Sequence, residues 1–134
     1  MRLELTGKTE LTIRALNELN RRGSTTVTRG EDLAAALDTT KNYLPQVMSP
    51  LVSHGWVAST AGPSGGYTIA TSSDDISLLQ LIEAVEGPAE DGQCVLKGTP
   101  CPDQGPCALH EPWTRARSAL MNELAGTPVA EVHQ

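Results

Sequence analysis

Apolar residues recur at helical spacing in the first part of the chain. The pattern predicts an amphipathic helix over residues 8–22, because apolar side chains three or four positions apart share one face of a helix. The basic pair Arg21-Arg22 followed by Gly23 is typical of a helix end. The apolar members of this stripe are Leu11, Ile13, Leu16 and Leu19.

A second, short helix is expected to follow and to reach Leu37. Thr28 and Glu31 have the spacing of a capping box, in which the hydroxyl caps the helix and the carboxylate returns to the backbone N–H of the cap residue. Two apolar positions, Leu33 and Ala34, give this helix an inner face.

A third helix is predicted after residue 40, with Thr39 or Thr40 as its cap. Pro45 suits the first turn of a helix, whereas Pro50 is expected to kink the helix or to end it. The apolar side chains of this helix are Tyr43, Leu44, Val47, Met48, Leu51 and Val52.

Two short β-prone runs then flank a loop rich in Gly and Pro. Residues 55–59 and 67–70 are joined by residues 60–66, a pattern that predicts a β-hairpin with a long tip. Three helices followed by a hairpin predict a winged helix–turn–helix, whose third helix enters the major groove of DNA. The alternative from pattern alone is a generic small α+β domain.

The last third of the chain predicts two more helices. Ser77 and Gln80 form a capping box that opens a helix from Leu78 to Glu86. Pro112 suits the first turn of a final long helix, which Gly126 stops. One face of it packs either on its own domain or, as we prefer, on a second subunit. That face carries Trp113, Ala116, Arg117, Leu120, Met121 and Leu124.

The fold class is therefore mainly α with a small β-hairpin wing. Residues 1–75 are expected to form a winged helix–turn–helix DNA-binding domain. Residues 76–134 are expected to hold a cysteine loop, at about 87–110, and a dimerisation helix, at about 111–125. A homodimer would match the two-fold symmetry of palindromic DNA sites.

Composition adds limits to this picture. The chain has 134 residues, no Phe, two Trp and two Tyr, so its core depends on aliphatic residues and a partner would help to bury more surface. No apolar run approaches the ~18 residues of a membrane span, and no signal peptide is recognisable, so a cytoplasmic protein is expected. The net charge of −6 disfavours nucleic acid only mildly, because the local charge decides binding.

Three cysteines lie within fourteen residues, and a histidine follows at once. Cys94, Cys101 and Cys107 cannot all pair as disulfides, and they precede His110 in a stretch rich in Gly and Pro. Thiolates select zinc, copper(I) or iron–sulfur clusters, and imidazole suits several of the same metals. The spacing favours a metal or cluster loop over unrelated surface cysteines. A Cys107 nucleophile beside His110 would be the enzymatic alternative, but no catalytic triad accompanies it, so we expect no enzyme.

These motifs, taken in order, resemble the IscR/NsrR family of bacterial winged-helix regulators that bind iron–sulfur clusters. The resemblance covers nearly the whole chain and implies a homodimer joined by the C-terminal helix. The matching segments are Met1-Arg2-Leu3, Tyr43-Leu44, Gly55-Trp56-Val57-Ala58-Ser59, Gly62-Pro63-Ser64-Gly65-Gly66-Tyr67 and the loop from Cys94 to Trp113.

The resemblance implies that Cys94, Cys101 and Cys107 hold the cluster, and it leaves two candidates for the fourth ligand. In IscR-like members a His three residues after the last Cys ligates, which is His110 here and implies a 2Fe-2S cluster. In NsrR-like members a carboxylate of the partner subunit ligates, which is Glu10 here and implies a 4Fe-4S cluster. We prefer His110. If they are not ligands, Glu10 is a solvated charge that the helix dipole favours in the first turn, and His110 is the N-cap of the last helix.

DNA contacts are expected from basic and polar residues around the second helix, the third helix and the wing. IscR-like members carry Arg in the wing where this chain has Ala61, so minor-groove anchoring is expected to be weak. The candidate contacts are Arg2, Lys8, Arg29, Thr39, Thr40, Lys41, Asn42, Gln46, Ser64 and Gly65, with Arg14 as a further cation.

The sequence thus predicts a transcription regulator whose promoter binding is controlled by an iron–sulfur cluster sensing redox state, nitric oxide or iron–sulfur status. The alternative is a winged-helix DNA-binding protein stabilised by zinc, since three Cys and one His form an ordinary structural zinc set. The short Cys-x-x-Cys pairs usual at zinc sites are missing from this chain.

Overall fold

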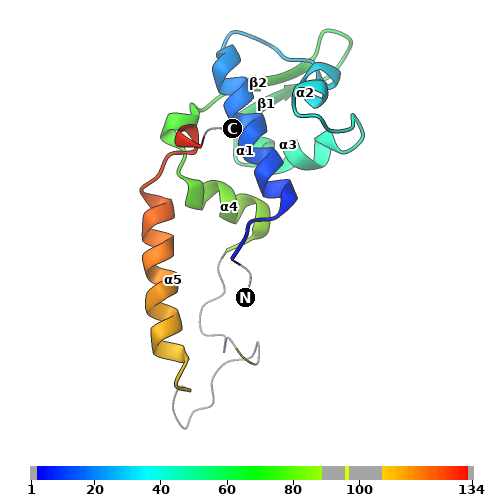
Figure 1. Cartoon of the computed structure of the whole chain (residues 1–134). Helices are drawn as coiled ribbons and strands as arrows, with labels where there is room; N and C mark the ends of the chain where they lie inside the picture. The colour runs from blue at the N-terminus through cyan, green and yellow to red at the C-terminus, as the bar shows by residue number, and fades with distance from the viewer. Residues whose placement is uncertain (1–2, 89–95, 97–106, 133–134) are drawn as a thin grey trace.

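The computed structural model describes residues 3–88, 96 and 107–132. Figure 1 shows a head made of α1, α2, α3 and a hairpin, an arm made of α5, and α4 between them. This order confirms a mainly helical winged helix–turn–helix with an appended long helix. The elements are α1 (Gly7–Arg22), α2 (Gly30–Ala36), α3 (Leu44–Ser53), β1 (Val57–Thr60), β2 (Gly66–Ile69), η1 (Ser73–Asp75), α4 (Leu78–Glu86), α5 (His110–Ala125) and η2 (Val129–Glu131).

Helix α1 agrees with its prediction to within one residue. Thr6 caps it by accepting a hydrogen bond from the N–H of Thr9 at 3.2 Å. Gly23 ends it with φ of 95°, a left-handed conformation that favours glycine, and donates its N–H to Leu19. The stripe faces inward, and Leu16 is fully buried.

The hydrophobic core is shared by the head and the elements that follow it. Side chains beyond residue 75 belong to the same cluster as those of α1 and α3. The fully buried large members include Leu16, Leu19, Leu33, Leu44, Met48, Leu51, Ile76, Leu81 and Val129. Burial of a leucine of this kind contributes about 1.5–3 kcal/mol to stability. Helix α4 and η2 therefore help to hold the head together.

The predicted capping box at Thr28 and Glu31 is wrong. Arg29 occupies the N-cap position of α2 without a side-chain hydrogen bond to the helix. Thr28 instead pairs its backbone with Tyr67: each N–H donates to the other's carbonyl, at 2.9 and 2.8 Å. The chain before α2 thus lies beside the wing as an extended segment, and the Glu31 carboxylate pairs with Arg29 at 3.2 Å.

Helix α3 starts later than its threonines suggest. The Thr40 hydroxyl accepts the N–H of Tyr43 at 3.1 Å, so it caps the turn that leads into α3 at Leu44. Pro45 lies in the first turn, as predicted. Pro50 lies inside the helix, which continues to Ser53. Pro50 has no N–H to donate to the carbonyl of Gln46, and the helix ends three residues later.

The predicted hairpin is confirmed, and two glycines determine how tightly it packs. Strands β1 and β2 are antiparallel, with Val57 opposite Ile69 and Thr60 opposite Gly66. A Cβ atom at Gly66 would lie 2.2 Å from the carbonyl oxygen of Thr28. A Cβ atom at Gly65 would lie 2.1 Å from the Thr60 oxygen. No side chain fits at either position without moving the backbone.

Helix α4 has the predicted bounds and the predicted capping box. Gln80 donates its N–H to the Ser77 hydroxyl at 3.1 Å, and the Ser77 N–H returns to Gln80 Oε1 at 2.9 Å. The chain after α5 then comes back to this point. Leu78 donates its N–H to Thr127, and Val129 donates to Ile76, both at 2.8 Å. The end of α5 is thereby fastened to the start of α4.

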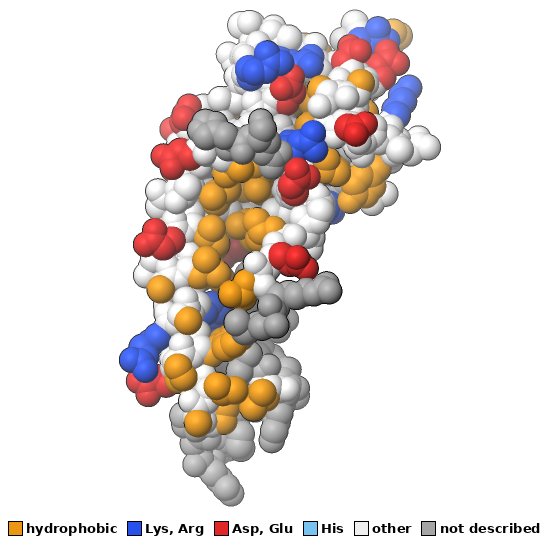
Figure 2. All heavy atoms as spheres, viewed as in Figure 1, with side chains coloured by type: hydrophobic (Ala, Val, Ile, Leu, Met, Phe, Trp, Pro, Cys, Tyr) orange, Lys and Arg blue, Asp and Glu red, His pale blue; other side chains and the backbone are white. Residues whose placement is uncertain are grey.

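Helix α5 contacts α4 along one side, but none of its residues is fully buried in the single chain. It begins at His110, one residue before the predicted start. Trp113 keeps 36% of its surface exposed and Leu120 keeps 49%. Figure 2 shows hydrophobic side chains along this arm of the molecule.

The close approach at Gly66 gives a prediction for stability. Gly66→Ala should lower the free energy of unfolding by about 1–3 kcal/mol, because the added methyl group meets the Thr28 backbone rather than a flexible side chain. Urea unfolding followed by circular dichroism measures the change. Gly7→Ala is the matched control, since no atom lies within 4 Å of its Cβ position, and it should cost nothing. Equal stability of the two variants would contradict the packing described here.

Candidate metal centre and nucleic-acid interface

The last cysteine and the following histidine lie in one turn at the start of α5. His110 donates its backbone N–H to the carbonyl of Cys107 at 3.0 Å, and both residues are partly buried. Leu109, rather than His110, occupies the N-cap position, and His110 is the first helical residue. Cys94 and Cys101 lie outside the described residues.

Glu10 lies in the first turn of α1, where the helix dipole favours a carboxylate. Its nearest cation is Arg14, one turn further on, at 3.6 Å. This separation exceeds hydrogen-bond length, and 47% of the Glu10 side chain is exposed. The carboxylate is therefore accessible to another group.

The two candidate fourth ligands lie far apart within one chain. Figure 1 shows the first turn of α1 against α4, whereas α5 begins at the outer tip of the arm. Cys107 and His110 share that tip, so this chain brings the histidine, and not Glu10, close to the last cysteine. Within one chain, Glu10 is therefore far from Cys107.

A hydrogen-bonded chain joins the start of α1 to the end of α4. The buried Thr9 donates its hydroxyl to Glu86 Oε2 at 2.5 Å, and the Thr6 and Thr9 hydroxyl oxygens are 3.0 Å apart. Glu86 is the last residue of α4 and precedes the cysteine loop. Local sequence patterns could not predict this contact, because 77 positions separate the two residues.

The start of α2, the segment before α3 and the wing tip meet around one hollow. Its volume is about 180 Å³, and its lining consists of Arg29, Gly30, Glu31, Lys41, Gly62, Pro63 and Gly65. Three parts of the predicted DNA face thus come together. The ion pair between Arg29 and Glu31 reduces the positive charge of this face. The sequence prediction missed the pairing of Glu31 with Arg29 because it assigned that carboxylate to a helix cap.

Helix α3 turns a polar face outward. Asn42, Gln46 and Ser49 are exposed and recur at helical spacing, so they share one side of the helix and its approach. Ser49 was not among the predicted contacts, although its spacing from Gln46 could have suggested it. Thr39 is half-buried and Lys41 is exposed. Thr40 is exposed, but its hydroxyl already accepts the N–H of Tyr43.

The remaining predicted DNA contacts are less well grouped. Lys8 belongs to the start of α1, beside α4 and away from the hairpin tip (Figure 1). Ser64 is exposed at the wing tip, whereas Gly65 is buried under it and presents little surface to a ligand. Arg2 lies outside the described residues.

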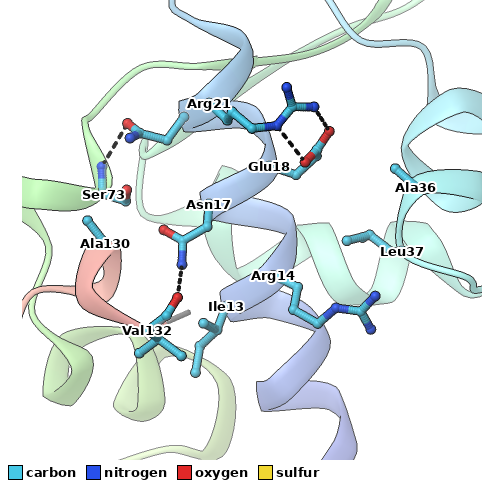
Figure 3. A pocket seen from close by; sticks show the side chains of 11 residues that line it. Ile13, Arg14, Asn17, Glu18, Arg21, Ala36, Leu37, Ser73, Ala130 and Val132 are labelled. Carbon is cyan, nitrogen blue, oxygen red and sulfur yellow. Dashed lines mark hydrogen bonds and ion pairs between the residues drawn. The ribbon is translucent and has the colours of Figure 1, made fainter. Parts of the chain in front are cut away.

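A larger hollow, of about 480 Å³, crosses the outer face of α1 (Figure 3). Glu18 lies there between two guanidinium groups, with Arg21 Nη2 at 2.5 Å and Arg22 Nε at 2.9 Å. The hydrogen bonds from Arg21 hold the pKa of the Glu18 carboxyl below its usual value. On the other side of the hollow, Asn17 Nδ2 donates to the carbonyls of Val129 and Val132, at 3.1 and 3.3 Å. These contacts fasten η2 to α1.

Within residues 3–88, 96 and 107–132, no helix is long and apolar enough to cross a membrane.

The profile of the Rrf2 family, described as iron-dependent transcriptional regulators, matches residues 5–134. The chain is 30% identical over 132 residues to the HTH-type transcriptional regulator CymR of Bacillus subtilis, covering 98% of this chain and 89% of CymR. It is 25% identical over 130 residues to protein rrf2 of Nitratidesulfovibrio vulgaris, covering 97% and 87% of the two chains.

Solved structures share the fold. The structure of B. subtilis CymR, a global cysteine regulator, has a TM-score of 0.76 at 26% identity and covers 99% of this chain and 100% of that one. T. potens IscR has a TM-score of 0.72 at 18% identity, covering 98% and 93%, a likeness of fold alone. These relatives are regulators of transcription, which confirms that this protein is not an enzyme. With its winged head, its exposed α5 arm and a family match over almost its full length, the chain belongs to the Rrf2 family of transcriptional regulators.

Proposed function

We propose that this regulator binds promoter DNA as a homodimer and that an iron–sulfur cluster in the cysteine loop controls its affinity. The observation that carries the proposal is the position of Cys107 and His110 at the start of α5, the helix that remains exposed in the single chain. A group bound there would act directly on the arm that joins two DNA-binding heads.

The donor set fits such a cluster. Three thiolates are the ligands that iron–sulfur clusters take, and the loop supplies Cys94, Cys101 and Cys107 with six and five residues between them. Bound there, a cluster would supply a group that reacts with oxidants or nitric oxide, or that is lost when iron is scarce.

His110 is our preferred fourth ligand because it lies in the same turn as Cys107. An imidazole ligand raises the potential of a cluster and implies the 2Fe-2S form. Glu10 of a second subunit is the alternative and implies the 4Fe-4S form. Its exposed carboxylate supports that alternative, and the hard oxygen ligand would leave a labile position on a soft cluster.

Zinc is the competing occupant, since Cys94, Cys101, Cys107 and His110 could also form a closed tetrahedral site. CymR, a relative described as a cysteine regulator, is a reminder that the input can differ between members of one family. Purification without oxygen, followed by absorption spectra and iron, sulfide and zinc counts, distinguishes the two. A colourless protein with one zinc per chain would refute the cluster.

DNA would meet the face formed by α2, α3 and the wing. Asn42, Gln46 and Ser49 lie where base edges in the major groove would be read. Arg29, Lys41 and the exposed wing tip would position the phosphate backbone. With few cations on this face, each head contributes few phosphate contacts, so two heads acting together matter for affinity.

A second copy of the chain is the partner we propose for α5. Leu109, Trp113 and Leu120 are exposed and spaced by four and seven positions, so they form one continuous apolar face. Burying it against the same face of another chain gives an isologous, two-fold dimer. Both DNA-binding heads would then be held at a distance that α5 determines.

The ligand assignment can be tested by substitution. Ala at Cys94, Cys101 or Cys107 should abolish the visible absorption of the anaerobic protein, because three thiolates are needed to anchor the cluster. His110→Ala should leave a cluster that assembles, absorbs differently and decays faster. Glu10→Gln and the control His54→Ala should leave spectrum and lifetime unchanged. The reverse pattern for His110 and Glu10 would assign the carboxylate, and no effect of either would contradict both candidates.

The Arg29–Glu31 pair gives a prediction about DNA affinity. Glu31→Gln should tighten promoter binding by about 3- to 10-fold, because it removes a negative charge and frees Arg29 for a phosphate. The slope of log affinity against log salt should steepen by about 0.9, the change expected for one added phosphate contact. Glu131→Gln removes the same charge from η2, away from this face, and should do neither. Fluorescence anisotropy at several salt concentrations measures both quantities.

The apolar face of α5 predicts the oligomeric state. Leu120→Glu should shift the dimer toward monomer, with a dimer dissociation constant raised at least about tenfold, because a charge would be buried in the contact. Asn122→Glu adds the same charge on another side of the same helix and should leave the dimer intact. Sedimentation equilibrium decides. A Leu120→Glu protein that stays dimeric would show that this face does not join the subunits.

A further inference from the structure

We propose that Glu86 is a positioning residue that ties the first turn of α1, and Glu10 with it, to the root of the cysteine loop. Through this tie, a change in the loop reaches the DNA-binding head along α1. The inference rests on the proposed function, because it names how that site would be coupled to DNA binding.

The contacts form a directed chain. A hydroxyl carries one proton, and Thr9 donates its proton to Glu86 Oε2 at 2.5 Å, so Thr6 must donate in the 3.0 Å contact with Thr9. The N–H of Thr9 returns to the Thr6 oxygen at 3.2 Å. The cap of α1 and the carboxylate of α4 are therefore parts of one network.

Charge and burial explain why this link is specific. Glu86 lies in the last turn of α4, where the helix dipole disfavours a carboxylate and where no basic residue compensates. The carboxylate instead lies against the first turn of α1, whose dipole favours a negative charge. Thr9 is fully buried, so its hydroxyl needs this acceptor. Helix α1, rather than its own helix, holds the Glu86 side chain in place.

The link continues in both directions. Toward the loop, Gly87 follows directly with φ of 88° and donates its N–H to Glu83, so the chain leaves α4 at a fixed angle. Toward the head, Thr12 lies one turn after Thr9; its hydroxyl donates to the Lys8 carbonyl at 2.8 Å and lies 3.3 Å from the Val47 carbonyl of α3. The helical backbone of α1 therefore connects the contact with Glu86 to the contact with α3, and it provides a continuous physical path from the loop root to the head.

Hydrogen exchange tests the tie itself, without any cluster. In the metal-free dimer, Thr9→Val removes the hydroxyl and keeps the shape. It should speed exchange at the Gly87 amide and in the last turn of α4 by about tenfold, since that end of α4 loses its anchor. Thr9→Ser should restore the wild-type rates. Glu83→Ala, which removes a carboxylate from the same turn, should leave the first turn of α1 unaffected, whereas Glu86→Ala should loosen it.

DNA binding tests the consequence. Thr9→Val and Glu86→Ala should leave the DNA affinity of the metal-free protein within about twofold of the wild-type value. Each should reduce the ratio between the cluster-loaded and metal-free DNA affinities at least about fivefold, which is the lower range of allosteric coupling. The double variant should be no worse than either single one, because both break one link. Glu86→Gln, whose amide oxygen can still accept from Thr9, should keep most of the response.

The outcomes separate this inference from the proposed function. If the DNA affinity of the wild-type protein were the same with and without the cluster, the proposed function would be wrong. The hydrogen-exchange measurement alone would then test the link between Thr9 and Glu86. If a substitution changed hydrogen exchange only within its own helix, the proposed link between α1 and α4 would be wrong, even in a protein whose DNA binding responds to the cluster. Equal weakening of DNA binding with and without the cluster would show a merely structural role and would also overturn that link.

Discussion

Helix α1 is the element on which the other segments depend, because its polar side chains bind parts of the chain that lie far away in sequence. Asn17 holds η2 through two carbonyls, and Asn20 accepts the N–H of Ser73 in η1 at 3.1 Å. Thr9 and Thr12 reach α4 and α3. While one face of α1 fills the core, these contacts satisfy buried polar groups that would otherwise destabilise the fold. Helix α1 thereby contacts α3, the turn η1 that follows the hairpin, α4 before the cysteine loop and η2 after α5.

Much of this fold could be predicted because the relevant information is local. The Ser77–Gln80 box, the glycine ends of α1 and α4, and the hairpin depend on residues a few positions apart. Thr28 was misjudged because its backbone has a competing partner in Tyr67, 39 positions away, as the register of the bridge shows. The two short turns η1 and η2 carry little periodicity of their own and are fixed by asparagines of α1.

For the candidate site, too, some features follow from local sequence and others depend on how distant elements pack. That clustered thiols bind a metal or cluster follows from their chemistry, whichever way the loop folds. Which residue completes the set of ligands depends on distances between elements. The sequence alone could not show that the first turn of α1, with Glu10, lies beside α4, whereas α5 and His110 begin at the outer tip of the arm. Nor could it show that Glu31 neutralises Arg29 or that Gly65 is buried, since both depend on how the wing packs against α2.

The acidic balance of the chain bears on how such a regulator can be controlled. The net charge of −6 opposes DNA binding only mildly, but the ion pair between Arg29 and Glu31 lowers the positive charge that the proposed DNA face offers to phosphates. In the proposed homodimer, affinity for a palindromic site would then come largely from two heads that bind together at the correct spacing. In that dimer the spacing would depend on the angle of α5, whose end is fastened beside η2 and which begins directly after the cysteine loop. A small change at Cys107 would therefore act on the quantity to which binding is most sensitive, and it would need no change in the base-reading side chains.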